Sequence, residues 1–386
     1  MSGQDAGIVE LSVTCFIHSL AGGGAERVMA GLTSRLSQRG HSVTLVTLDD
    51  GSGDRHQIDP AVRRVTLNLS SDAVGPLGKF RQVRQRHQAI ATTIRAHMPD
   101  VVLSFCDRMN IDVLLSSHRL GPPIVVSERS DPARQSLGWF WDLLRKRSYP
   151  HASAVVALTE ASAAYLRPFS HRVEVIPSAV DTPTVCSHRD QAIGRKLIVG
   201  AGRLEAEKGF DRLLEAFAKA TEFDPSWQLV IYGEGSLRDQ LTRQAQMLQI
   251  ADRFQLPGWM RPLSESLAQA TLFCLPSQYE GFPSVLLEAM SLGVPSISVD
   301  CESGPRVIVD HGRNGLLVEP SIEGLCEGIS RMISSPAERE KLGRAGTGIV
   351  EQFGWPAMVD RYESLLSDVA RRHRDWTNTL SESFNH

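Results

Sequence analysis

Residues 10–29 read ELSVTCFIHSLAGGGAERVM, and this stretch decides the first half of the fold. The apolar run over Glu10–His18 predicts a strand, and the glycines at 22–24 predict a turn. Apolar residues at helical spacing then predict a helix over Ala25–Arg39. A strand that passes through glycine into a helix is typical of a parallel α/β domain.

The same order returns at residues 197–217, LIVGAGRLEAEKGFDRLLEAF. Between the two stretches short apolar runs alternate with helical segments, and the alternation breaks after residue 177 in a segment rich in proline, glycine and polar residues. The sequence therefore predicts two α/β domains, each with its loops at the carboxyl ends of its strands, where ligands bind. The predicted segments are a first domain at 1–177, a linker at 178–196, a second domain at 197–353, a C-terminal helix at 354–373 that crosses back to the first domain, and a polar tail at 374–386.

Composition and charge limit the classes of partner. The net charge of the 386 residues is −3, with 21 Lys and Arg against 18 Asp and Glu up to residue 190 and 20 against 26 after it. This balance argues against nucleic acid as a partner. Six cysteines lie scattered without C-x-x-C pairs, which predicts free thiols in a reducing compartment. No signal peptide precedes the first strand and no apolar run reaches the roughly 20 residues of a membrane span, so we expect a cytoplasmic protein.

The first candidate site is the turn Gly22-Gly23-Gly24. Glycine lets a backbone approach an anion, and the start of a helix offers free N–H groups. A dinucleotide fingerprint is excluded because Arg27 stands where the last glycine is required, and no Gly-Lys-Ser/Thr ending marks a Walker A loop. The turn is either part of a phosphate site or a plain tight turn.

The second candidate site is the segment GRLEAEKG at 202–209, between a strand and a helix. Arg203 and Lys208 would lie at the helix start, where two cations and the helix dipole favour a diphosphate. The alternative is a solvated loop in which these cations pair with Glu205 and Glu207.

The third candidate site is EGFPSVLLE at 280–288. Amides near Ser284 can hold phosphate oxygens, Glu288 in the helix can accept ribose hydroxyls, and Glu280 in the loop can reach the sugar beyond the phosphates. A paired-carboxylate hydrolase is the rival. If both glutamates were helical they would lie roughly 12 Å apart along the axis, whereas hydrolase carboxyl groups lie roughly 5–9.5 Å apart. The spacing favours two separate duties.

The order of these sites resembles that of a GT-B fold retaining glycosyltransferase of family 4, also called glycosyltransferase group 1. The resemblance covers nearly the whole chain and rests on four stretches: His18–Met29, Gly202–Phe217, Tyr279–Met290 and Gly293–Glu319. It implies an α/β protein in which two Rossmann-like domains face a central cleft. It also implies a nucleotide diphosphate sugar as co-substrate, with no cofactor and no metal.

The resemblance implies a role for each matching residue. The catalytic residues would be Glu280 at the transferred sugar, with Arg203 and Lys208 on the donor diphosphate. The other donor-binding residues would be Gly23 and Gly24, which leave room for phosphates and acceptor, Gly258 at the nucleotide base, Phe282, Pro283 and Ser284 at the helix start, and Glu288 on the ribose.

The mechanism that we expect follows from charge. Negative charge grows on the diphosphate as the glycosidic bond breaks, and Arg203, Lys208 and helix-end amides are placed to meet it. No DxD motif lies beside these residues, so we expect metal independence. We expect front-side attack with retention, in which the leaving phosphate takes the acceptor proton; a covalent carboxylate intermediate is the alternative. UDP is the favoured nucleotide, and GDP-mannose stays open.

The acceptor side is indicated by a basic segment. Residues 73–99 contain no acid and interleave Lys, Arg and His with apolar residues, and Trp139-Phe140-Trp141 precedes Leu143-Leu144-Arg145-Lys146-Arg147. Both patterns are typical of a helix on an anionic membrane surface, or of a solvated face above core aromatics. In the membrane reading the protein is peripheral on the inner face of the cytoplasmic membrane and the acceptor is a polyprenyl-diphosphate-linked saccharide. Residues 127–132, SERSDP, resemble the corresponding segment of bacterial transferases that build such oligosaccharides. Those transferases act in surface polysaccharide assembly.

His18, Asp107 and Glu128 are the candidates that would orient the acceptor hydroxyl, with structural capping as the alternative for Asp107 and Glu128. Two other functions stay open. One is a nucleotide-sugar-processing enzyme on the same fold, such as an epimerase or a phosphorylase-like enzyme. The other is a catalytically silent subunit, against which the presence of Arg203, Lys208 and both glutamates argues.

Overall fold

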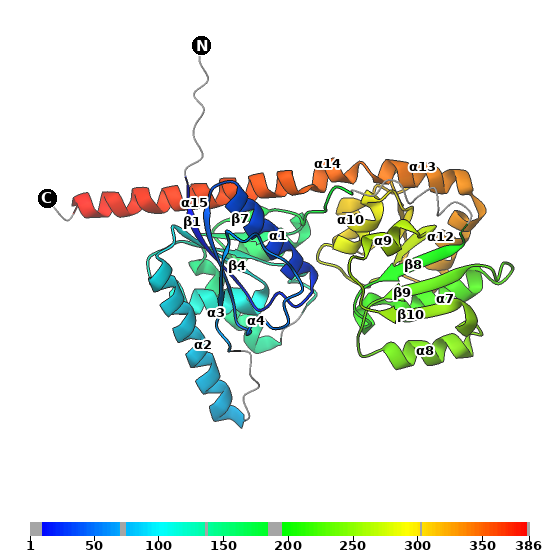
Figure 1. Ribbon diagram of the computed structural model, residues 1–386, viewed down its shortest axis with the longest axis horizontal. Helices are drawn as coiled ribbons and strands as arrows, with labels where there is room; N and C mark the ends of the chain where they lie inside the picture. Colours follow the sequence, from blue (N-terminus) through cyan, green and yellow to red (C-terminus); the bar gives the residue numbers. More distant parts are fainter. Residues whose placement is uncertain (1–9, 70–74, 136–137, 184–194, 302, 384–386) are drawn as a thin grey trace, which may run out of the picture. The chain divides into compact units, whose positions relative to one another are not determined.

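The computed structural model describes residues 10–69, 75–135, 138–183, 195–301 and 303–383, to which the following statements refer. The chain divides into two compact units, one of Met1–Pro177 with Pro356–His386 and one of Ser178–Trp355. Each unit is built on one parallel sheet, and Figure 1 shows helices on both faces of each sheet. The predicted α/β class is confirmed.

The sheet of the first unit has the strand order β3-β2-β1-β4-β5-β6-β7. Strand β4 pairs with β1 on one side and β5 on the other, and its residues are buried because helices cover both faces. The strands are β1 (Ser12–Ile17), β2 (Ser42–Thr47), β3 (Arg63–Thr66), β4 (Val101–Phe105), β5 (Ile124–Ser127), β6 (Ala154–Ala157) and β7 (Val173–Val175). The helices are α1 (Gly24–Gln38), α2 (Gly75–His97), α3 (Asp107–Ser117), α4 (Trp139–Ser148), α5 (Glu160–Leu166), η1 (Tyr149–His151) and η2 (Arg167–Phe169).

Helix α15 (Trp355–Ser383) packs on the first unit. The buried Tyr362 hydroxyl lies 3.0 Å from Ser127 Oγ, and Asp368 pairs with Arg172 at 2.6 Å. The helix continues ten residues past 373, and residues 374–379 of the predicted polar tail are exposed within it. The physical reason is that residues 357–383 contain neither glycine nor proline, so nothing ends the helix where its buried face ends.

The sheet of the second unit has the order β10-β9-β8-β11-β12-β13. Its strands are β8 (Leu197–Ala201), β9 (Gln228–Tyr232), β10 (Phe254–Gly258), β11 (Leu272–Leu275), β12 (Ser296–Val299) and β13 (Leu316–Val318). Its helices are η3 (Ala206–Lys208), α7 (Phe210–Ala220), α8 (Arg238–Met247), η4 (Ala251–Arg253), α9 (Ser264–Ala268), α10 (Ser284–Ser291), α11 (Pro305–Ile308), α12 (Ile322–Ser334), α13 (Pro336–Gly346) and α14 (Ile349–Phe353).

The strand order reverses between β1 and β4 in the first unit and between β8 and β11 in the second. Ligands of such sheets bind beyond the carboxyl ends of the strands at this switch point. His18 and Asp107 follow β1 and β4, and the loops that hold Lys208 and Glu280 follow β8 and β11. The topology therefore places His18 and Asp107 at the switch point of the first unit, and Lys208 and Glu280 at that of the second.

The described cysteines are free thiols, as their scattered positions predict. Cys15, Cys106, Cys274, Cys301 and Cys326 are unpaired, and Cys186 lies outside the described residues. Within the described part of the chain no helix combines the length and the apolar character that crossing a bilayer requires.

Candidate active site

Three loops of the second unit meet at Glu280. They follow the neighbouring strands β8, β11 and β12 and contribute Lys208, Ser277 and Ser303. Lys208 Nζ and Ser277 Oγ each donate to Glu280 Oε1 at 2.7 Å. Ser303 Oγ donates to the backbone carbonyl of Glu280 at 2.7 Å. The structure thus brings two of the three predicted catalytic residues into direct contact.

The Lys208–Glu280 pair is shielded from solvent. The two side chains are 17% and 11% exposed, so the ion pair is stronger than one at the open surface. A lysine ammonium has three N–H donors, and one bond to Glu280 leaves two for an anion. Glu280 Oε2 has no polar partner among the described residues. The pair therefore offers a carboxylate oxygen and two ammonium protons to a ligand.

The loop after β8 is pressed against the loop after β11. Gly209 has φ 66°, and a Cβ at this residue would lie 2.4 Å from the carbonyl oxygen of Pro276. The backbone N–H of Gln278 donates to the backbone carbonyl of Glu207 at 2.8 Å. Only glycine permits both the left-handed turn and the close approach, so Gly209 fixes the adjacent Lys208 beside Glu280.

Arg203 stands at the exposed side of the same loop. Its side chain is 71% exposed and pairs with Glu207 Oε1 at 2.8 Å. Glu205 instead accepts hydrogen bonds from the amide and hydroxyl of Ser236. The alternative was a loop in which both cations pair with its own glutamates. It holds for Arg203, which pairs with Glu207, but not for Lys208, which pairs with Glu280.

Helix α10 carries the remaining donor-side candidates. Pro283 is its N-cap, and the buried Phe282 packs edge-on against Phe353 with ring centroids 5.4 Å apart. Ser284 and the half-buried Glu288 are four residues apart and lie on one face of the helix.

Gly258 ends the edge strand β10 in a fixed turn. Its φ is 95°, and a Cβ there would lie 2.6 Å from Glu234 Oε1. Arg238 holds Glu234 through two bonds of 2.9 Å and donates to the carbonyl of Leu256 at 3.0 Å. The turn predicted to lie at the nucleotide base is thus shaped by an arginine–glutamate pair.

The first unit places its acceptor-side candidates at one edge of the sheet. His18, Asp107 and Glu128 follow β1, β4 and β5, which are adjacent and parallel. Burial lowers the pKa of His18, and the nearby Asp112 carboxylate opposes this shift. The imidazole is therefore neutral near pH 7, and the side chain of Asp107 is 15% exposed beside it at the start of α3.

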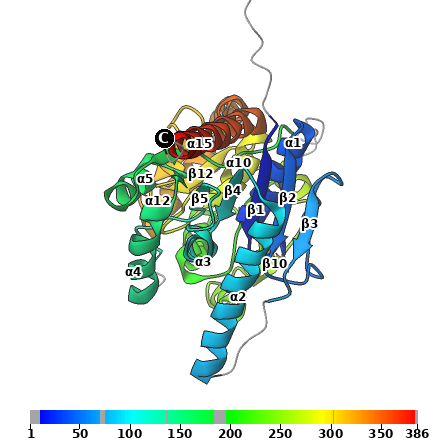
Figure 2. The ribbon, with the colours of Figure 1, turned by 90° about the vertical axis from the view of Figure 1, so that its left-hand side faces the viewer.

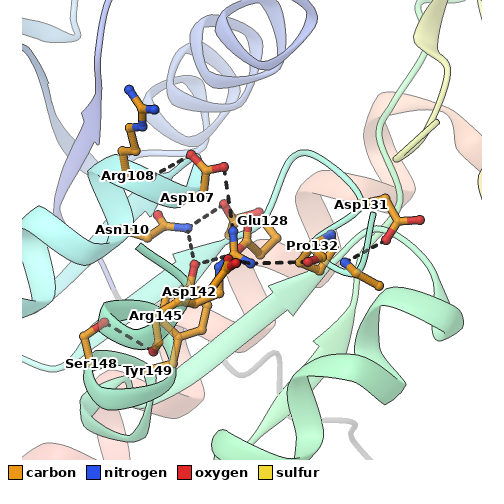
Figure 3. A network of polar contacts seen from close by, with 12 residues as sticks. Asp107, Arg108, Asn110, Glu128, Asp131, Pro132, Asp142, Arg145, Ser148 and Tyr149 are labelled. Carbon is orange, nitrogen blue, oxygen red and sulfur yellow. Dashed lines mark hydrogen bonds and ion pairs between the residues drawn. The ribbon is translucent and has the colours of Figure 1, made fainter. Parts of the chain in front are cut away.

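Glu128 does not reach the surface. It accepts a hydrogen bond from Tyr149 and lies 3.3 Å from Arg145 Nε, in the buried network of Figure 3. Burial raises the pKa of Glu128 to about 7, with the Arg145 charge opposing the shift. These contacts favour the structural alternative for Glu128 and leave His18 and Asp107 as the more accessible candidates.

Arg145 belongs to the interior, so its predicted place on a membrane-facing surface is wrong. Its side chain is 1% exposed, donates to the carbonyl of Pro132 at 3.3 Å and lies 3.8 Å from Asp107 Oδ2. The reason is helical spacing: Trp141 and Leu144 pack against the core, and Arg145 is four residues after Trp141 on the same face.

The glycine turn of the first unit is covered by its own helix. Gly23 is the N-cap of α1, and a Cβ at Gly23 would lie 2.2 Å from Glu26 Oε2. Burial raises the pKa of Glu26, and a bond from its own backbone amide opposes the shift. Glu26 therefore lies at the helix start near Gly23 and Gly24, where phosphates were predicted.

No cluster of three or more possible metal ligands of the His, Cys, Asp or Glu type occurs among the described residues.

Two family models match consecutive parts of the chain. The model described as Glycosyltransferase Family 4 matches residues 22–183, and that described as Glycosyl transferases group 1 matches residues 188–348. The chain belongs to the group 1 glycosyltransferases. Together the two matches span both units, with the Glu280 site inside the second.

Relatives of this glycosyltransferase include enzymes of bacterial saccharide assembly. An α-1,4-N-acetyl-D-galactosaminyltransferase of Campylobacter jejuni, named for an undecaprenol-diphosphate-linked acceptor, is 26% identical over 93% of this chain and 99% of its own. An exopolysaccharide phosphotransferase of Streptomyces coelicolor is 35% identical over 58% of this chain, and the match spans 24% of that longer protein.

The solved structure of HepE from Anabaena in complex with UDP has the same fold. It is 18% identical, with a TM-score of 0.75 over 92% of this chain and 100% of that one. This likeness shows the GT-B fold of the glycosyltransferase.

Sequence reasoning missed Ser277, Ser303 and Glu26, and it assigned Arg145 to the surface. In the glycosyltransferase, Ser277 and Ser303 hold Glu280, Arg145 lies beside Asp107, and Glu26 lies over the glycine turn. For Glu26 a signal was available, because an acid in the first turn of a helix commonly reaches back to its start. The two serines and Arg145 carry no local pattern that marks them.

Proposed function

We propose that this glycosyltransferase moves a hexose or N-acetylhexosamine from a nucleoside diphosphate sugar, with UDP favoured, and retains the anomeric configuration. The contact of Lys208 with Glu280 carries the proposal, because it places a cation for a diphosphate 2.7 Å from a carboxylate for the sugar. The UDP bound to HepE supports the choice of nucleotide.

The chemistry follows from the charges at this contact. The bond from the anomeric carbon to the diphosphate oxygen breaks, and the free N–H groups of Lys208, with Arg203, stabilise the negative charge that forms. The acceptor oxygen bonds to the same face of the anomeric carbon while its proton passes to the leaving phosphate oxygen. Because two side-chain cations supply the positive charge, we propose that no bridging metal is needed.

A lipid-linked saccharide is the acceptor that we propose. The Campylobacter relative is named for such an acceptor, and α2 offers a surface suited to a membrane. Leu77 is 87% exposed, Phe80 is also exposed, and α2 contains no acid. Figures 1 and 2 show the first turns of α2 extending beyond the body of the first unit. Arg81 and Arg84 are exposed there and would attract anionic lipid.

Only part of the basic segment fits this membrane role. Arg86 pairs with the buried Asp112 at 2.7 Å, and His87 lies 3.1 Å from the same carboxylate, so both attach α2 to α3.

A second exposed aromatic group is on α4, where Trp139 is 79% exposed and Phe140 is exposed beside it. Helix α3 packs against both α2 and α4. We propose that α2 and α4 hold the protein on the inner face of the cytoplasmic membrane, in polysaccharide or oligosaccharide assembly.

A transfer assay tests the proposal. The purified protein is incubated with UDP-sugars and GDP-mannose and with a polyprenyl-diphosphate saccharide in vesicles, and the product anomer is assigned by NMR. An α-linked donor should give an α-linked product. A β-linked product would contradict retention, an epimerised donor without transfer would favour the epimerase, and donor binding without turnover would favour a silent subunit.

A further inference from the structure

Ser277 lies buried at the turn between β11 and the loop of Glu280, and its hydroxyl donates to Glu280 Oε1 at 2.7 Å. We propose that Ser277 is a positioning residue for transfer: it fixes Oε1 so that Oε2 faces the transferred sugar throughout turnover. The inference rests on the proposed function of Glu280 and names a residue that sets its geometry.

The turn that carries Ser277 is fixed on both sides. Before it, the carbonyl of Pro276 accepts a hydrogen bond from Arg212 Nη2 at 2.9 Å. After it, the backbone N–H of Gln278 donates to the backbone carbonyl of Glu207 at 2.8 Å. The Ser277 hydroxyl is therefore presented from a rigid support, and a short bond from such a support defines the position of a carboxylate oxygen.

The backbone of Glu280 is held by other groups. Ser303 Oγ donates to the Glu280 carbonyl, and a Cβ at Gly304, whose φ is 70°, would lie 3.1 Å from the same carbonyl oxygen. These contacts fix where the residue is but leave its side-chain torsions open. Within the described part of the chain, Ser277 and Lys208 are the two groups that hold the carboxylate itself.

Lys208 cannot do this work alone during turnover. Its ammonium is also the proposed ligand of the diphosphate, so its charge is shared between Glu280 and the donor as the bond breaks. The hydroxyl of Ser277 has one proton, which is committed to Glu280, and the residue is buried. Ser277 therefore influences the reaction through Glu280 and has no second ligand to serve.

The first test is Ser277→Ala. This variant loses a hydrogen bond to a charged group, so its kcat should fall about tenfold to a hundredfold. The donor KM and the Kd of UDP should change less than about threefold. Ser277→Thr keeps the hydroxyl and should recover most of the loss. The control is Ser296→Ala, which removes another buried hydroxyl of this sheet, one that donates to the Val294 carbonyl at 2.9 Å, and should keep full activity.

A double-mutant cycle separates positioning from a merely structural role. If Ser277 acts through Glu280, Ser277→Ala should cost little further kcat in a Glu280→Gln background; additive losses would overturn the inference. If Ser277→Ala has a lower melting temperature than Ser296→Ala, Ser277→Cys takes its place in the cycle. Cysteine has nearly the size of serine but is a weak hydrogen-bond donor. If the unaltered protein transfers sugar and Ser277→Ala keeps its kcat, the inference alone fails; if the unaltered protein transfers none, the proposed function falls with it.

Discussion

The ammonium of Lys208 donates to Glu280 Oε1 across 2.7 Å, although the two residues are 72 positions apart in the chain. The sequence assigns them separate duties, one at the diphosphate and one at the sugar. Their contact means that neither duty can be altered without affecting the other. The predictions for this pair take that coupling into account.

Glu280→Gln should lower transfer at least about a hundredfold, because the carboxylate proposed to act at the sugar is lost. UDP should bind somewhat more tightly, by about threefold, because Lys208 no longer shares its charge with a carboxylate. Transfer assays and titration calorimetry measure the two effects. Equal loss of transfer and UDP affinity would refute a role confined to the transferred sugar.

Lys208→Met should weaken UDP binding and turnover together, each by about tenfold to a hundredfold, because the proposed charge-assisted bond to the diphosphate is lost. Arg203→Ala should act in the same direction but less, because its side chain is 71% exposed. Arg243→Ala, at an exposed arginine of α8, is the matched control and should leave both quantities unchanged. A Lys208 variant that loses turnover but binds UDP normally would move the lysine away from the donor.

Chelation should leave transfer unchanged, because in the proposed mechanism Lys208 and Arg203 supply the positive charge for the leaving diphosphate. The measurement is the initial rate with EDTA, then with Mg²⁺ or Mn²⁺ restored. A rate that falls with EDTA and returns with one of these ions would contradict the proposed mechanism.

The joint change Arg81→Gln with Arg84→Gln should reduce binding to vesicles that contain phosphatidylglycerol by about thirtyfold, at roughly 1 kcal/mol per basic residue. Phe80→Ser should weaken binding further by removing an inserted ring. The controls are Arg243→Gln and Phe223→Ser, which alter exposed residues of the second unit. Unchanged cosedimentation of the α2 variants would remove this helix from the membrane surface.

Glu128→Gln should change how stability depends on pH. In the folded protein burial raises the pKa of Glu128 to about 7 from 4.5, so between these pH values the unfolded chain binds fewer protons than the folded one. The free energy of unfolding therefore falls as pH rises through this window, by about 3 kcal/mol for this group. Urea unfolding from pH 4 to 8 should show a shallower fall for Glu128→Gln than for the exposed control Glu160→Gln. Equal slopes would contradict the shifted pKa.

Much of the fold could be predicted because apolar runs alternate with helical stretches. Strand β3 at Arg63–Thr66 gave no such run, since it lies at the sheet edge and is only partly buried. The length of α15 was underestimated because residues 374–379 are exposed and carry no burial signal. Both errors occur where burial, the signal that sequence patterns report, is weak.

The candidate site was partly predictable for a different reason. Motif positions identified Lys208 and Glu280, but their mutual contact depends on how loops from β8 and β11 approach each other around Gly209. Ser277 was invisible because a serine after a strand is common in any turn. Arg145 was misread because a basic run suggests solvent, whereas its partner Glu128 lies 17 residues away in the chain.

The most direct test of the central claim is a thermal-shift and calorimetric titration of the purified protein with UDP, GDP and ADP and their sugars, with EDTA present. We expect one nucleoside diphosphate family to stabilise the protein, and we expect Lys208→Met to lose that stabilisation while Arg243→Ala retains it. No stabilisation by any of these nucleotides, or stabilisation that Lys208→Met leaves intact, would contradict a donor site built on Lys208 and Glu280.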